Sequence, residues 1–118
     1  MCRYITAEQL LGLIFDNLIR RQLYNIDVTV LSIVEKEVQN LIRKKHNAIL
    51  CTSKKEIYSI VDNYSDFFKL LDNKIIINKN LQRDIDRDNF IYKIDKYFVD
   101  GIPNDISMTL KTKLEEIL

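Results

Sequence analysis

Basic and hydroxylated side chains in three neighbouring stretches of this 118-residue sequence are the first candidates for chemistry. Lysine and arginine neutralise phosphate groups, whereas serine and tyrosine hydrogen-bond to them. The stretches lie at the end of one predicted helix, at the start of the next helix and on a predicted hairpin. The candidate contact residues are Arg43, Lys44, Lys45, Lys54, Lys55, Tyr58, Ser59, Lys69, Lys74 and Lys79. Their types and spacing predict a surface that binds nucleic acid or a partner protein.

A second candidate site is the acidic string that begins at Asp84. Asp84, Asp86 and Asp88 occupy alternate positions, as do the first ligands of a calcium-binding loop, whose twelfth position here is Asp95. Such a loop needs glycine at its sixth position, where this chain has Asn89, and a bidentate glutamate at its twelfth. The three acids therefore fit a solvated helix face better than a metal site, and the sequence leaves metal binding by them open.

Residues suited to a nucleophile or to a nucleotide-binding loop are sparse. The single histidine, His46, lies near Cys51, but no orienting partner and no glycine for an oxyanion hole accompany the pair. His46 fits instead the basic end of a helix, where positive charge is favoured by the helix dipole. Gly12 and Gly101 are isolated and form no phosphate-binding loop, and Gly12 fits a close-packing position. We expect a protein that is not an enzyme and carries no cofactor.

Composition and charge describe one ordinary folded domain over residues 1–118. Apolar residues make up 47% and charged residues 30%, with 18 basic against 17 acidic side chains and a formal net charge of +1. No apolar run approaches the ~18 residues of a membrane helix, and two isolated cysteines fit a reducing compartment. The 18 isoleucines, 12 lysines and 10 asparagines, against 2 alanines, reflect AT-rich codons. We expect a cytoplasmic protein without membrane contact, from a low-GC bacterium, a phage or plasmid, or a large DNA virus.

Long helices with few breaks must position the candidate residues. Capping boxes at Thr6 and Ser53 start two of these helices, and Asp27 or Thr29 caps another. Apolar residues at helical spacing continue each pattern. The predicted elements are helices over about 7–24, from 27 or 29 to 46, over 54–63, 81–99 and 105–118, with a break at 25–27 and a short strand at 48–51.

The hydrophobic pattern changes from helical to extended over residues 67–78. Two apolar stretches, Phe67–Leu71 and Lys74–Asn78, flank the pair Asp72 and Asn73. Aspartate and asparagine tolerate positive φ better than other non-glycine residues, so this pair predicts a two-residue type I′ turn. The sequence thus predicts a β-hairpin that carries the last three lysines of the candidate set.

A helix that begins after Ser53 and is followed at once by a hairpin resembles the recognition helix and wing of winged-helix domains. The resemblance covers residues 48–78 and concerns the order of elements. It implies that the outward face of this helix, with Lys55, Tyr58 and Ser59, meets the major groove while hairpin lysines reach phosphates. The long preceding helix departs from that family. The predicted fold class is mostly α with a small β-hairpin, in which a winged-helix-like unit is flanked by N- and C-terminal helices.

Two functions of different classes follow from these patterns. The first is a small, non-enzymatic regulator that binds nucleic acid, although its pI of 7.7 lies below the ~9 typical of dedicated nucleic-acid-binding domains. The alternative is a stoichiometric inhibitor or adaptor of phage or viral type that binds a host protein or nucleoprotein complex, for example an anti-defence protein. A homodimer is also open, because one apolar stripe of the last helix fits either the protein's own core or a second copy: Ile106, Leu110, Leu114 and Ile117.

Overall fold

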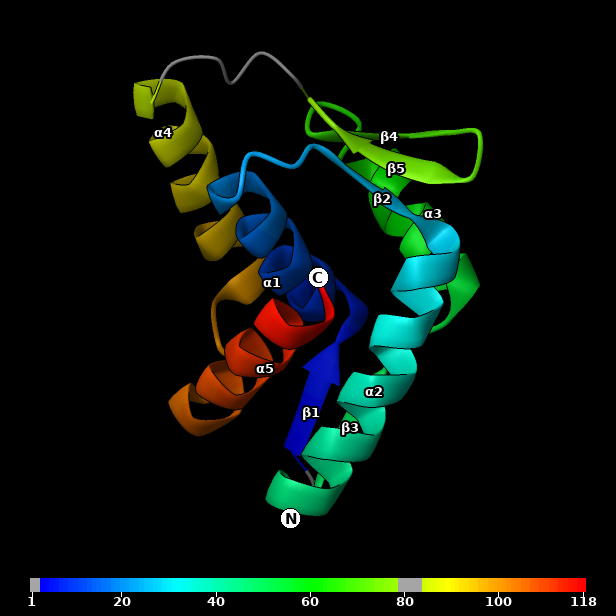
Figure 1. The fold of residues 1–118 in the computed structure, drawn as a ribbon, viewed down its shortest axis with the longest axis vertical. Coiled ribbons are helices and arrows are strands. Elements are labelled where there is room, and N and C mark those ends of the chain that lie inside the picture. The colour runs from blue at the N-terminus through cyan, green and yellow to red at the C-terminus, as the bar shows by residue number, and fades with distance from the viewer. Residues whose placement is uncertain (1–2, 79–83) are drawn as a thin grey trace.

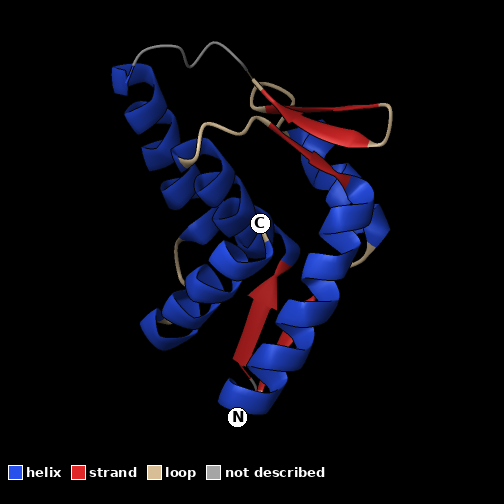
Figure 2. Ribbon diagram, in the orientation of Figure 1, coloured by secondary structure: helices blue, strands red, loops and turns tan. Residues whose placement is uncertain are grey.

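The structure is a computed structural model that describes residues 3–78 and 84–118, and it is mostly helical with strands in two places (Figures 1 and 2). The elements in chain order are β1 (Arg3–Thr6), α1 (Ala7–Arg20), β2 (Asn25–Asp27), α2 (Val28–His46), β3 (Ala48–Cys51), α3 (Lys54–Asn63), β4 (Phe68–Leu71), β5 (Lys74–Ile77), α4 (Asp84–Ile94), the π-helix η1 (Asp95–Val99) and α5 (Asn104–Ile117). The predicted combination of helices with a small antiparallel sheet is confirmed. Within the described residues, no helix combines the length and apolarity needed to cross a membrane.

Helix α1 lies at the centre of the molecule. Helices α4 and α5 lie on one side of it, and α2 lies on the other side (Figure 1). The predicted capping box is present: the Gln9 N–H donates to Thr6 Oγ1, and the Thr6 N–H donates to Gln9 Oε1. Gly12 lets η1 approach closely, because a Cβ atom at this position would lie 2.5 Å from the Cβ of Phe98. The helix ends at Arg20, four residues earlier than predicted.

The predicted hairpin is confirmed, and it belongs to a larger sheet than expected. Asp72 and Asn73 have φ angles of 51° and 62°, as a type I′ turn requires. The prediction of a simple break at 25–27 was wrong, because these residues form β2, which pairs antiparallel with β5 to give the order β2-β5-β4. A three-residue strand is too short to show alternation, and its pairing partner lies some fifty residues away along the chain.

A second sheet of two parallel strands lies at the other end of the molecule (Figure 2). Strand β3 was predicted, whereas β1 was not, because the capping box at Thr6 dominates the local pattern there. Ile5 and Leu50 face each other across this pair and are buried. The Gln39 side chain of α2 accepts a hydrogen bond from the Leu50 N–H at 3.0 Å.

Local caps define the helices that carry the candidate residues. The Asp27 carboxylate accepts the Thr29 N–H at 2.8 Å, and the Ser53 hydroxyl accepts the Glu56 N–H at 3.2 Å. Helix α2 stops where Asn47 takes a left-handed conformation with φ 48°. Helix α3 has the predicted bounds. The spacing predicts that Ile57, Ile60, Val61 and Tyr64 face inward; the first three are buried, and Tyr64 is partly buried against the core.

The C-terminal helices settle two alternatives left open by the sequence. The backbone from Asp84 to Ile94 is one continuous α-helix, so the acidic string does not form the loop that a calcium site needs. Asp88 does not interrupt this helix. The apolar stripe of α5 packs on the protein's own core, because Ile106, Leu110 and Leu114 are fully buried.

Candidate binding surface

Helix α3 presents a polar face to solvent, as the sequence predicted. Lys54, Lys55 and Ser59 are exposed, and Tyr58 is half-buried. The opposite face is held in the core by its three buried aliphatic residues, so packing sets which side chains point outward. Asp62 and Asn63 complete the exposed face. The face therefore offers hydrogen-bond donors and acceptors together with charges of both signs.

The first turn of α3 meets the hairpin turn at one hollow of about 290 Å³, which we call the tip hollow. Its lining comes from three elements: Val28, Thr29 and Ser32 of α2, Lys54 and Tyr58 of α3, and Asn73 of the hairpin turn. The Val28 N–H donates to the Asn73 carbonyl at 2.9 Å, which ties the hairpin turn to the start of α2. Two of the predicted contact residues, Lys54 and Tyr58, thus lie beside the hairpin.

Acidic side chains lie close enough to two of the lysines for their charges to interact. Burial raises the pKa of the Glu35 carboxyl, and the nearby Lys54 ammonium acts in the opposite direction. The pKa of Asp27 is lowered, first by hydrogen bonds from Thr29 and also by the charge of Lys74, its cross-strand neighbour. Part of the positive charge at the tip hollow is therefore compensated within the protein.

Three other basic candidates lie far from the hairpin. Arg43, Lys44 and Lys45 are exposed at the C-terminal end of α2. Arg43 follows Ser32 by eleven residues, which corresponds to roughly 16 Å along a helix axis. Lys45 lines a different hollow, against α5. The structure thus separates these residues from the tip hollow, and Lys79 lies outside the described residues.

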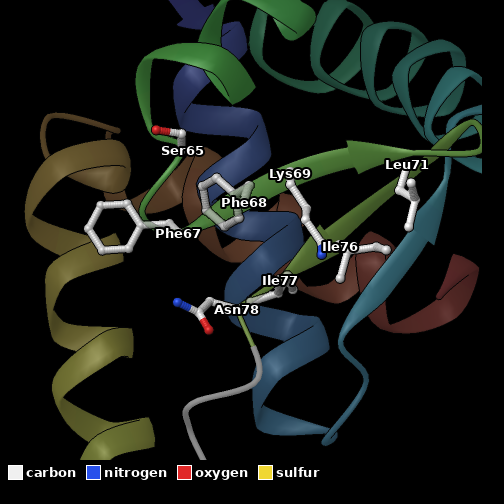
Figure 3. A pocket seen from close by; sticks show the side chains of 8 residues that line it. All are labelled: Ser65, Phe67, Phe68, Lys69, Leu71, Ile76, Ile77 and Asn78. Atoms are coloured by element: carbon white, nitrogen blue, oxygen red, sulfur yellow. The ribbon is translucent and has the colours of Figure 1, made fainter.

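Lys69 belongs to a hollow of about 550 Å³ on the outer face of the hairpin, which we call the sheet hollow (Figure 3). The apolar part of its lining comes mainly from Phe67, Leu71 and Ile76, and Asn78 adds an amide. Lys69 and Ile76 are direct cross-strand neighbours, so the ammonium group lies at the border of an apolar surface. Sequence reasoning missed this surface. The signal for it was the run Ile75–Ile77, in which the middle residue must face away from the core when its neighbours face inward.

His46 has a structural role. Its Nδ1 lies 3.3 Å from the Asp105 carboxylate, and its Nε2 lies 2.8 Å from the Thr109 hydroxyl. Arg3 donates to both Asp105 oxygens and, at 3.3 Å, to the His46 carbonyl. Hydrogen bonding to the Arg3 side chain is the main cause that holds the pKa of Asp105 below its usual value. The ring nitrogens of His46 thus contact α5 and not Cys51, which argues against a nucleophile pair.

Asp16 is a buried acid that sequence reasoning missed. Its carboxylate pairs with the Arg20 guanidinium at 2.9 Å, one helical turn away on α1. Burial raises the pKa of Asp95, and the nearby charge of Asp16 raises it further. The signal was an aspartate inside an apolar stripe with an arginine four residues later. In the part of the chain that the structure describes, three or more acids, histidines or cysteines do not gather in a group able to hold a metal ion.

Comparison of the chain with protein-family models, with curated proteins and with solved structures gives no match.

Proposed function

We propose that this protein is a winged-helix-like module that binds nucleic acid through α3 and the adjoining hairpin. The observation that carries the proposal is the order α1, β2, α2, β3, α3, β4, β5 together with the sheet order β2-β5-β4. A winged-helix domain also has a strand between its first two helices that pairs with the hairpin, and β2 corresponds to it. This strand was absent from the helix–hairpin pattern of the sequence, so it supports the resemblance independently.

The connection between α2 and α3 limits what such a module reads. A helix-turn-helix joins its helices by three or four residues, whereas residues 47–53 connect α2 and α3 here and include β3. Helix α2 is also long, at 19 residues. Asp62 adds negative charge to the exposed face of α3. We therefore propose contact mainly with the phosphate backbone, without a defined base sequence.

The number of available lysines limits the expected salt dependence. Four lie on α3 or the hairpin: Lys54, Lys55, Lys69 and Lys74. Each neutralised phosphate of duplex DNA contributes about −0.9 to the slope of log K against log salt. Since two of these lysines face acids, we expect a slope between about −2 and −3.6.

A matched pair of charge reversals tests the proposal. Lys55→Glu reverses a charge on the exposed face of α3. Lys93→Glu makes the same change at an exposed position of α4, a helix that lies across α1 from α3 (Figure 1). Fluorescence anisotropy with random duplex DNA at low salt measures the binding. We expect Lys55→Glu to abolish binding and Lys93→Glu to leave most of it. Equal losses in both variants, or no binding by the unchanged protein, would contradict the proposal.

The sheet hollow favours a second candidate function, a stoichiometric inhibitor or adaptor that binds a host protein. Leu71 is half-exposed beside Ile76, and apolar side chains in a hollow bind protein segments better than phosphates. This function predicts a discrete complex with one host protein that Leu71→Asp disrupts and Lys55→Glu leaves intact. Chromatography of the protein with a low-GC bacterial extract, followed by the same two variants, separates this function from DNA binding.

A further inference from the structure

Strand β4 is the outer strand of the three-stranded sheet. It pairs with β5 on one side, and no described element pairs with its other side. Figure 1 draws β4 at the border of the sheet, with α3 against the sheet's inner face. An exposed strand edge presents unpaired N–H and C=O groups, which are a template for pairing with another strand.

The hydrogen bonds around the hairpin identify the free groups. The Asn78 N–H donates to the Phe67 carbonyl at 2.9 Å, so these two residues bond to each other across the hairpin. In an antiparallel pair such residues alternate with residues whose backbone groups point away. Leu70 therefore directs both its N–H and its C=O away from β5. Phe68 also points away, but its N–H already donates to the Tyr64 carbonyl at 3.1 Å. Leu70 is the residue on which a new strand would centre.

The side chains along this edge are apolar and accessible. Leu70 is 44% exposed and Leu71 is 51% exposed, although they point to opposite faces of the sheet. Proteins usually protect an edge with proline, a bulge or several charges. Strand β4 has one such feature, the exposed Lys69. The edge therefore has both the free backbone groups and the apolar side chains that strand pairing uses.

We propose that β4 pairs antiparallel with β4 of a second copy of this chain, with Leu70 at the two-fold axis. In this register Leu70 exchanges two backbone hydrogen bonds with Leu70 of the second copy. Lys69 then lies opposite Leu71 of the second copy, so no like charges face each other directly. Phe68 lies opposite Asp72 of the second copy, on the other face of the sheet from Lys69. The edge is thus complementary to itself in hydrogen bonding and apolar contact, without like charges directly opposite each other, and this complementarity favours a second copy as its occupant.

Pairing in this register joins the three strands of each copy into one six-stranded sheet. Only four-residue strands meet, so the buried area is small and the dimer is expected to form at high protein concentration. The inference does not rest on nucleic-acid binding by α3.

A proline substitution tests the backbone bonds directly. Leu70→Pro removes the N–H that would donate to the Leu70 carbonyl of the second copy. This N–H points away from β5, so the substitution breaks no hydrogen bond within the hairpin. Proline is tolerated on an edge strand when its nitrogen faces solvent. Leu70→Ala is the matched control, since it shortens the same side chain and keeps the N–H. Sedimentation equilibrium over a range of concentrations gives the dissociation constant of each, and circular dichroism reports folding.

We expect the unchanged protein and Leu70→Ala to dimerise, with a dissociation constant about tenfold or more higher for Leu70→Pro than for Leu70→Ala. A second pair leaves the backbone untouched: Leu71→Glu faces Lys69 of the second copy and tightens the dimer, while Leu71→Lys weakens it. Monomeric behaviour of the unchanged protein at the highest concentration overturns the proposal, and so does equal dimerisation of Leu70→Pro and Leu70→Ala. A dimer that both Leu71 variants leave unchanged overturns the register.

Discussion

Replacing Gly12 by alanine sets helix propensity against packing, and the geometry predicts that packing prevails. Alanine is favoured over glycine inside a helix by about 1 kcal/mol. The added Cβ atom, however, would lie 2.5 Å from the Cβ of Phe98 and 2.9 Å from a γ-carbon of Val99. A Cβ atom is fixed to its backbone, so no rotamer change relieves the shorter contact. Helix α1 and η1 must separate for alanine to fit.

The expected size of the effect follows from these two contributions. Overpacking a well-filled core costs about 1 to 3 kcal/mol, and a Cβ–Cβ contact this short belongs at the upper end. Subtracting about 1 kcal/mol of helix propensity leaves a net loss of about 2 kcal/mol in the free energy of unfolding. For a chain of this length that loss lowers the melting temperature by about 6 to 10 °C.

Thermal and guanidinium unfolding of Gly12→Ala measure this loss. Gly101→Ala is the contrasting control, because a Cβ atom there would meet its nearest neighbour, the Gln9 amide nitrogen, only at 3.7 Å. Its cost comes from a φ of 90° instead, and about 1 to 2 kcal/mol is expected. Adding Val99→Ala to Gly12→Ala should restore only part of the stability, since the contact with Phe98 remains. A Gly12→Ala protein as stable as the unchanged one would refute the close approach of α1 and η1.

Two further predictions concern the core and the acid response. Phe68→Ala should lower the free energy of unfolding in urea by about 3 to 5 kcal/mol, because the ring is buried and stacks on Phe15 with centroids 4.1 Å apart. Phe67 is only half-buried, so Phe67→Ala should lower it clearly less. Equal losses in the two variants would contradict this packing. Folding lowers the pKa of Asp105, so its ion pair with Arg3 stabilises the fold fully above the unfolded value of 3.8 and is lost as pH falls through the lower folded value. Asp105→Asn should therefore reduce the urea midpoint near neutral pH and bring it close to that of the unchanged protein at about pH 2; an unaltered midpoint at neutral pH would contradict the role of this pair.

Much of the local structure was predictable because its causes lie within a few residues along the chain. The Thr6 and Ser53 hydroxyls cap their helices through N–H groups three residues later, so both starts could be read directly. The hairpin turn depends on Asp72 and Asn73, which adopt the positive φ angles that their side chains tolerate. Spacing alone also identified the inward face of α3.

The candidate site was less predictable, since it depends on where elements lie relative to one another. The sequence grouped Arg43, Lys44 and Lys45 with Lys54 because few residues separate them along the chain. In the structure the connecting strand β3 returns along α2, so that Lys54 reaches the N-terminal end of α2. Proximity in sequence therefore did not become proximity in space.

By itself, the sequence determined the approximate extent of the helices, the caps at Thr6 and Ser53 and the hairpin, because hydrogen bonds and apolar spacing within one or two turns suffice for them; it did not predict the early end of α1 or the π-helix η1. The tertiary structure alone decided that β2 joins the hairpin, that β1 pairs with β3, and that β4 is the outer strand, with no described strand on its other side. Strands obtain their hydrogen bonds from partners distant in the chain, so three or four residues carry too little pattern to reveal the pairing. The position of β4 at the outside of the sheet and the distance between the basic residues both depend on contacts between segments far apart in the chain.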